Sequence, residues 1–222
     1  MLKTRIFQFN ALGTNCVVSW ADGSRRCTVF DPGMSSPEGI KDILEFMRKH
    51  GLEPDAILLT HGHFDHVWGV SALLEHFSVP VYMCADDKEI LARGASLFNG
   101  MPTFKNLKVD FETVDVPEEL SSGGVNWTVL RTPGHTPGGV CYYSPENNLL
   151  ISGDTLFAGA IGRTDLIGGD YDILMKSLLE KVMLLPDDTD VIPGHGQPTS
   201  IGREATTNPF LQPFNEPLPD DE

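Results

Sequence analysis

The chain contains the stretch Thr60-His61-Gly62-His63-Phe64-Asp65-His66, directly after the short apolar run Ala56–Leu59. The run predicts a buried strand, so the stretch lies at a strand end, where loops build functional sites. In extended chain, His61 and His63 point the same way and suit one shared cation. Asp65 and His66 begin the next turn and can face a second cation. A lone histidine is more often a satisfied polar residue, but four candidate ligands in six residues favour a site for zinc or iron.

Three further turns place a histidine or an aspartate beside a glycine after a predicted strand. His135 follows the strand predicted at Trp127–Arg131, Asp154 follows Leu149–Ser152, and His195 follows Asp190–Ile192. Each residue taken singly is more often a cap or a turn residue. Together they favour a shared site, because five of the seven histidines of the chain occupy such turns. His50 and His76 lie at predicted helix ends, where a dipole interaction is a sufficient explanation.

The surrounding sequence predicts short strands and amphipathic helices. Ile40, Ile43, Leu44 and Met47 share one face of a helix, and Gly51 suits the position after its end. The predicted helices are Pro37–His50, Val70–Phe77, Asp86–Ala92 and Tyr171–Leu185, with a loop or lid at Arg93–Asn106. The further predicted strands are Thr4–Phe9, Cys16–Trp20, Cys27–Phe30, Val79–Met83 and Gly139–Tyr143. This order favours two sheets with helices outside, in an α/β or α+β domain.

Length and composition narrow the class of protein. The 222 residues suit one domain spanning 1–222, in which about 203–222 form a tail laid over the surface. The net charge of −15 disfavours nucleic acid as a substrate. No apolar run of 18 residues predicts a membrane span, and Met1–Phe9 has no apolar core typical of a secretion signal. The four cysteines form no C-x-x-C pair, which predicts reduced, buried thiols in a cytoplasmic protein.

The motifs, taken in order, resemble the metallo-β-lactamase superfamily, and within it the hydroxyacylglutathione hydrolases (glyoxalase II) in a short form. The resemblance covers almost the whole chain, and H-x-H-x-D-H followed by G-H-T-x-G, G-D-T and P-G-H-G is a highly specific combination. It implies an αββα sandwich of two mixed β-sheets, with helices on the outer faces and metals at one edge. The matching segments are Asp31-Pro32-Gly33, Thr60–His66, Gly134–Gly138, Ser152–Phe157, Gly162–Asp165 and Pro193–Gly196.

The resemblance also assigns the ligands of two divalent metal ions, zinc in the first place, with iron or manganese as alternatives. It gives one ion to His61, His63 and His135, the other to Asp65, His66 and His195, and makes Asp154 the bridge. Asp31 is then a carboxylate that orients a ligand histidine. Two such ions lower the pKa of a shared water to about 7. The expected reaction is hydroxide attack on the carbonyl of a thioester such as S-lactoylglutathione, with Asp154 and Asp65 as catalytic residues and Asp65 as the candidate proton shuttle.

Two departures leave the substrate open. Full-length glyoxalase II has a helical C-terminal domain that binds the glutathione portion, but only 27 residues follow His195 here. The segment Ile161–Leu166 has a form shared with short glyoxalase II-like hydrolases and with persulfide dioxygenases. Within it, Arg163 either contacts a substrate carboxylate or pairs with Asp165. The alternative function is a persulfide dioxygenase that uses a single iron and oxygen. A scaffold without activity is disfavoured by the intact ligand set, and β-lactam hydrolysis has no specific support.

Overall fold

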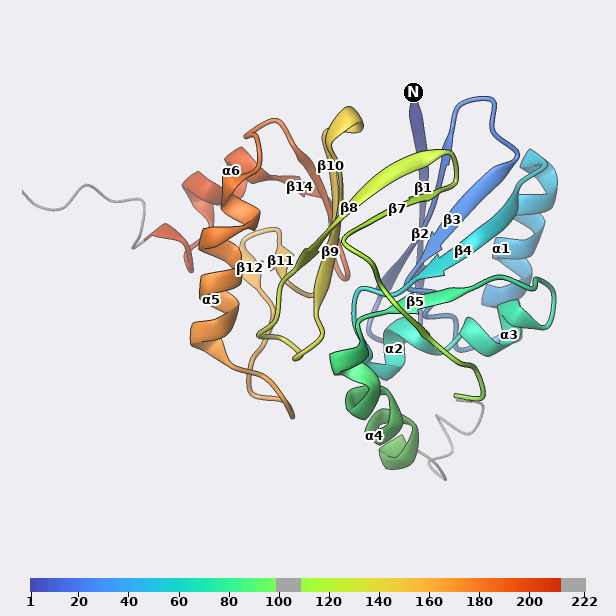
Figure 1. Ribbon diagram of the computed structural model, residues 1–222, viewed down its shortest axis with the longest axis horizontal. Helices are drawn as coiled ribbons and strands as arrows, with labels where there is room; N and C mark the ends of the chain where they lie inside the picture. Colours follow the sequence, from blue (N-terminus) through green and yellow to red (C-terminus); the bar gives the residue numbers. More distant parts are fainter. Residues whose placement is uncertain (99–108, 213–222) are drawn as a thin grey trace, which may run out of the picture.

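The central strands carry apolar side chains on both faces, so each sheet has to be covered on both sides. In β2 (Thr14–Ala21), Cys16 and Val18 join one core cluster, whereas Val17 joins a second. In β9 (Val140–Ser144), Tyr142 joins that second cluster. The computed structural model, which describes residues 1–98 and 109–212, meets this requirement with two facing sheets and helices outside them (Figure 1).

The first sheet is built by the first half of the chain. Its six strands lie in sequence order from β1 to β6. β1, β2 and β3 pair antiparallel, and β3 to β6 pair parallel. The sheet is therefore mixed. Its strands are β1 (Leu2–Phe9), β2 (Thr14–Ala21), β3 (Arg26–Phe30), β4 (Glu53–Leu58), β5 (Val81–Met83) and β6 (Val114–Asp115).

The second sheet is built by the second half, in the order β14-β13-β10-β9-β8-β7. It is mixed as well, because β10 and β13 pair parallel while the other neighbours are antiparallel. A separate two-stranded hairpin, β11 and β12, follows β10. The remaining strands are β7 (Glu119–Ser122), β8 (Val125–Arg131), β10 (Leu149–Gly153), β11 (Leu156–Phe157), β12 (Ala160–Ile161), β13 (Asp190–Pro193) and β14 (Thr199–Ser200).

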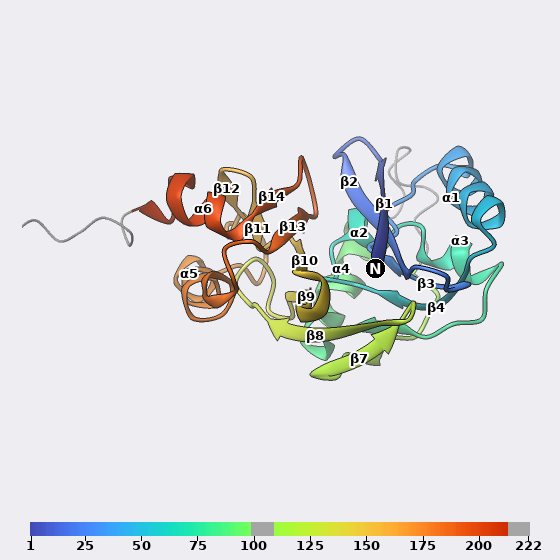
Figure 2. The same cartoon turned by 90° about the horizontal axis from the view of Figure 1, so that it is seen from above.

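Helices cover the outer face of each sheet, α1 and α3 on the first and α5 and α6 on the second (Figure 2). Three core clusters fill the spaces between these layers: the first includes Ile43 of α1, the second includes Trp127 between the sheets, and the third includes Leu174 of α5. The described helices are α1 (Pro37–His50), α2 (Phe64–Val67), α3 (Val70–Leu74), α4 (Lys88–Phe98), α5 (Tyr171–Glu180) and α6 (Ile201–Thr207), with 3₁₀ turns η1 (Ala85–Asp87), η3 (Pro145–Asn147) and η4 (Val182–Leu184). The αββα architecture expected from the resemblance is confirmed.

Several predicted boundaries were wrong. The loop or lid at Arg93–Asn106 begins instead as helix, because α4 continues to Phe98; the part from 99 to 106 lies outside the described residues. The helix predicted at Val70–Phe77 ends at Leu74. The helix predicted at Tyr171–Leu185 ends at Glu180, because Lys181 leaves the helical conformation and its amine donates to the carbonyl of Arg131 at 2.6 Å.

The predicted surface tail also needs correction over its first part. Residues 201–207 form α6, and Glu204 on this helix is fully buried. Its carboxylate accepts hydrogen bonds from the backbone of Gly159 at 2.7 Å and from the amide of Asn208 at 2.9 Å. The segment therefore braces the β11–β12 hairpin, in whose turn Gly159 lies, and residues 213–222 are outside the description.

Two expectations about the chain as a whole can be compared with the fold. All four cysteines are buried, and none forms a disulfide, as predicted. Within residues 1–98 and 109–212, we find no helix that combines the length and the apolar character needed to cross a bilayer.

Candidate metal centre

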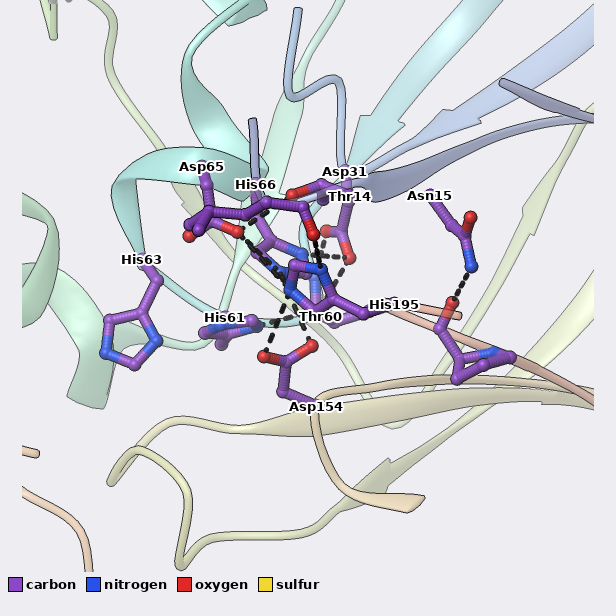
Figure 3. A network of polar contacts seen from close by, with 12 residues as sticks. Thr14, Asn15, Asp31, Thr60, His61, His63, Asp65, His66, Asp154 and His195 are labelled. Atoms are coloured by element: carbon purple, nitrogen blue, oxygen red, sulfur yellow. Dashed lines mark hydrogen bonds and ion pairs between the residues drawn. The ribbon is translucent and has the colours of Figure 1, made fainter. Parts of the chain in front are cut away.

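Loops from both sheets meet at one edge of the sandwich and bring seven predicted side chains together. The loop after β4 and the start of α2 supply four of them from the first sheet, and the loops after β8, β10 and β13 supply three from the second. Figure 3 shows Asp154 facing His61, His66 and His195 from the opposite side. Candidate ligand atoms lie within 4.8 Å of one another in three groups: His61, His63 and His135; His61, His66 and Asp154; Asp65, His66 and His195.

The first group consists of histidines whose ring nitrogens face one another. His135 Nδ1 lies 2.7 Å from the carbonyl oxygen of Arg163, which can only accept, so the ring donates through Nδ1. Its Nε2 then carries a lone pair and lies 2.9 Å from His63 Nδ1. His61 Nδ1 contacts the Thr60 hydroxyl at 3.0 Å, while its buried Nε2 has no hydrogen-bond partner. The unsatisfied nitrogen points to a group that the protein itself does not supply.

Asp65, His66 and His195, called the second group from here on, repeat this arrangement with a carboxylate. His66 donates through Nδ1 to Asp31 at 2.9 Å, and His195 donates through Nδ1 to the carbonyl of Leu12 at 3.1 Å. The remaining nitrogens, both Nε2, lie 3.2 Å apart. Asp65 Oδ2 lies 3.3 Å from His195 Nε2 and 3.5 Å from His66 Nε2. Three electron-rich atoms therefore converge on one point.

Asp154 lies between the two groups. Its Oδ1 is 3.4 Å from His66 Nε2, and its Oδ2 is 3.5 Å from the Nε2 atoms of both His135 and His195. Oδ1 is buried and makes no hydrogen bond. One carboxylate thus faces histidines of both groups, which is the position required of a bridging ligand.

The electrostatics of these protein groups favour added positive charge. Burial opposes the charge of His66, yet Asp65, Asp154 and Asp31 together raise its pKa well above the usual range. Burial likewise opposes the charge of His195, but the same two carboxylates of the cluster, Asp154 and Asp65, raise its pKa to about 9. Burial lowers the pKa of His63 to about 4, so this ring is neutral at pH 7 and keeps a lone pair. Lone pairs and carboxylates packed this closely repel unless a cation lies among them, so the residues fit divalent metal ions.

Close backbone packing brings the last loop against Asp154. A Cβ built on Gly194 would lie 2.1 Å from Asp154 Oδ1, so any larger residue would displace this carboxylate. Gly153 has φ of 50° and sits against Thr60 of the first sheet, where a Cβ would approach the hydroxyl to 2.3 Å. The glycines in these motifs therefore permit the close approach of the two sheets at this edge.

Asp31 occupies a strained turn behind the cluster. Its φ of 44° is unusual for a residue with a side chain. Its carboxylate accepts hydrogen bonds from the backbone and the hydroxyl of Thr60, at 2.8 and 2.6 Å, besides the one from His66. The structure thus places Asp31 where it fixes both the ring of His66 and the start of the loop that carries His61.

Asp87, a fully buried carboxylate in η1, also belongs to the site, although its motif did not predict it. Its Oδ2 accepts from the backbone of Gly62 at 2.7 Å and from the hydroxyl of Thr136 at 2.8 Å, and its Oδ1 accepts from the backbone of Gly138 at 2.6 Å. Asp87 therefore ties the loop of His61 and His63 to the loop of His135. No local signal separates it from the exposed Asp86 beside it, because only the tertiary structure buries one of the two.

The first hairpin also holds the centre, through Thr14 and Asn15 (Figure 3). The Thr14 hydroxyl donates to Asp65 Oδ2 at 2.8 Å. The Asn15 amide donates to the carbonyls of Pro193 and Gly196, at 2.9 and 3.0 Å, on either side of His195. These two residues were not predicted either, since their partners lie far away in sequence.

A cavity of about 770 Å³ opens beside the cluster. His63, Asp65, His135, Asp154 and His195 form its polar base. Arg163 lies on its wall, where the guanidinium makes two contacts of 2.7 Å with Asp165. Of the two predicted alternatives for Arg163, the ion pair is present, and a contact with substrate stays a prediction.

Comparisons with known proteins agree with this geometry. A family model described as the metallo-beta-lactamase superfamily matches residues 10–195. The chain is 43% identical over 194 residues to the probable metallo-hydrolase YqgX of Bacillus subtilis, an alignment that covers 86% of this chain and 89% of that protein. It is 36% identical over 214 residues to the hydroxyacylglutathione hydrolase GloC of Haemophilus influenzae, with 95% and 98% covered.

Two solved structures are similar at the same level of identity. BLEG-1 B3 metallo-beta-lactamase superposes with a TM-score of 0.84 at 36% identity, covering 94% of this chain and 99% of the other. TTHA1623, solved in a di-iron-bound form, superposes with a TM-score of 0.79 at 36% identity, covering 93% and 100%.

Proposed function

Because the chain belongs to the metallo-β-lactamase superfamily, we propose that it is a metal-dependent hydrolase of the glyoxalase II type that cleaves thioesters such as S-lactoylglutathione. The observation that carries the proposal is the convergence of five imidazoles and two carboxylates in two groups, with Asp154 facing both. The similarity to GloC supports the thioester as the substrate class.

The residues proposed to hold two divalent ions are the seven of the cluster. A pair of such ions supplies a Lewis acid and a water whose pKa falls to about 7. One ion is assigned to the first group and the other to the second, with zinc as the proposed metal because imidazole and carboxylate groups suit it. Iron is the alternative that TTHA1623 supports, since that relative was solved with two iron ions. The proposed ligands are His61, His63, Asp65, His66, His135, Asp154 and His195.

The protein's own groups orient the ligands and set their charge. Asp31 and the carbonyls of Arg163 and Leu12 each accept from a histidine Nδ1, which fixes the tautomer and leaves Nε2 free. Asp65 is proposed both as a ligand and as the candidate proton shuttle. Without bound ions, burial opposes its charge, but His66 and His195 lower its pKa to about 2, so the carboxylate is ionised and able to bind a cation.

The reaction that we propose needs no general acid from the protein. It consumes one water, breaks the carbon–sulfur bond, and yields a carboxylate, a thiol and a proton. A thiolate is a stable leaving group, so it departs without prior protonation. The net charge of −15 and the four buried thiols fit a small-molecule substrate and a cytoplasmic location, both of which we include in the proposal.

The alternative proposal is a persulfide dioxygenase that uses a single iron and oxygen. Such an enzyme would need only one of the groups, whereas here both are complete, which supports the hydrolase. The experiment tests metal-replete protein in three assays: thioester cleavage with and without oxygen, oxygen uptake with glutathione persulfide, and hydrolysis of a β-lactam. The β-lactam is included because the structure is similar to that of BLEG-1.

We expect thioester cleavage at equal rates in air and under nitrogen. We also expect its loss in His61→Ala and its retention in His76→Ala, which removes an exposed histidine outside the cluster. If glutathione persulfide drives oxygen uptake while thioesters are not cleaved, the protein is a dioxygenase instead. Faster turnover of the β-lactam than of any thioester would replace the thioester assignment.

A further inference from the structure

The walls of the cavity differ in character from its base. Apolar side chains line it from both halves of the molecule: Leu12, Phe64 and Ile90 from the first, and Phe157, Ile161 and Ile167 from the second. Leu12 and Ile167 are 57% and 53% exposed, although Ile90 and Ile161 are buried. Large apolar side chains exposed beside a candidate active site gain free energy when a ligand covers them.

The charges on the wall are already paired. Outside the histidine and aspartate cluster, the cationic residues among the described ones that line the cavity are Arg93 and Arg163. Arg163 makes its two contacts with Asp165, and Arg93 pairs with Glu89 one helical turn away. A glutathione tail carries two carboxylates, and it would meet only arginines that already have acidic partners. The described walls therefore match a hydrocarbon group better than a charged one.

We propose that the natural substrate is a thioester with an apolar acyl group, aliphatic or aromatic, which lies against this wall. The inference rests on the proposed thioester hydrolysis and specifies its substrate class. The acyl side is assigned because biological thiol carriers are polar and charged. The hydrocarbon part of such a thioester is thus the acyl group, and its polar carrier extends toward water.

The test is a series of thioesters of one neutral thiol, N-acetylcysteamine, with acetyl, butyryl, hexanoyl and octanoyl groups. Metal-replete protein should show kcat/KM rising by about two- to fourfold per methylene, the scale of burying that group, until the cavity is filled. S-Alkyl thioethers of the same lengths, which cannot be cleaved, should show the same trend as competitive ligands in a calorimetric titration. A flat or falling series would overturn the inference.

Matched variants show whether this wall makes the contact. Ile167→Asn changes a wall residue, and Ile173→Asn changes an isoleucine that is 46% exposed but does not line the cavity. The gain per methylene should shrink in Ile167→Asn, persist in Ile173→Asn, and return in Ile167→Leu. An unchanged gain in Ile167→Asn would overturn the placement of the acyl group.

S-Lactoylglutathione, a polar thioester, distinguishes a failure of the apolar substrate class from a failure of the proposed thioester hydrolysis. If it is cleaved while the acyl series is flat, the hydrolase stands and the apolar substrate class is wrong. If metal-replete protein cleaves no thioester in either set, the proposed function is wrong and the substrate class falls with it.

Discussion

Replacing Asp87 by asparagine is the sharpest test of how the metal centre is held together. This carboxylate hydrogen-bonds to no candidate metal ligand side chain, yet it accepts hydrogen bonds from Gly62, Thr136 and Gly138 in the two loops that carry the first group of histidines. Asparagine keeps the size of the side chain and exchanges one oxygen for an amide NH₂. The hydroxyl of Thr136 can reverse its role and accept from this group, but a backbone N–H cannot.

The size of the effect follows from the number of buried donors that lose their acceptor. Whichever way the new amide turns, the N–H of either Gly62 or Gly138 faces an NH₂ group. A buried donor left without an acceptor costs about 1–3 kcal/mol. Burial raises the pKa of the Asp87 carboxyl, so removing the buried charge offsets part of this cost. We expect a net loss of about 1–2 kcal/mol in the free energy of unfolding. If the loops relax apart, the same energy appears as about tenfold weaker metal binding.

The assay is a competition titration of zinc against a coloured chelator, beside urea unfolding of the metal-free protein. Asp86→Asn is the matched control, because it makes the same change at the exposed neighbouring position. If Asp87→Asn matches the wild type in both the free energy of unfolding and the metal affinity, the reasoning is refuted. An equal loss in both variants would refute it too, since the effect would then come from general surface charge.

The other predictions concern the ions themselves. Asp154→Asn removes the negative charge between the two groups. Elemental analysis should therefore show one ion lost, and kcat/KM should fall by at least about 10²-fold. Near-normal activity in this variant would show that Asp154 is not part of the site. His195→Ala should weaken one ion selectively and His61→Ala the other, in titrations that resolve two affinities; an identical loss in both variants would contradict the two groups. Chelation should lower Tm, since ions at 100 times their Kd stabilise the native state by about 2.7 kcal/mol; an unchanged Tm after verified metal removal would contradict binding at this cluster.

The sequence predicts helices best where local signals agree. α1 was predicted to the residue, because an apolar face, Pro37 and Gly51 all mark the same boundaries. α5 was predicted too long, since an apolar stripe continues through η4 although the backbone leaves the helix at Lys181. α4 was predicted too short, because the segment around Gly94 has no apolar period of its own, and the helix is extended there beside Phe64 of α2.

The candidate site likewise contains some residues that the sequence predicts and others that it does not. Its candidate ligand residues are visible in short motifs, because they lie in the glycine-bearing loops that follow strands or at the start of α2, directly after one of these loops. Asp87, Thr14 and Asn15 act on those turns from distant parts of the chain, and nothing in their own neighbourhoods distinguishes them. Residues that only position the ligands are therefore hidden until the two sheets are placed against each other.

The division of the cluster between two sheets has a consequence for how the protein is made. Synthesis proceeds from the N-terminus, so the ribosome releases His61, His63, Asp65 and His66 long before the loop of His195. The nascent first half presents a partial set of ligands, but it lacks Asp154 and the carbonyl partner that orients His135. If the two proposed ions bind here, full metal loading has to wait until the second sheet has docked. A chain truncated before that sheet would then remain inert, and acquisition of the second ion would mark the docking of the two sheets.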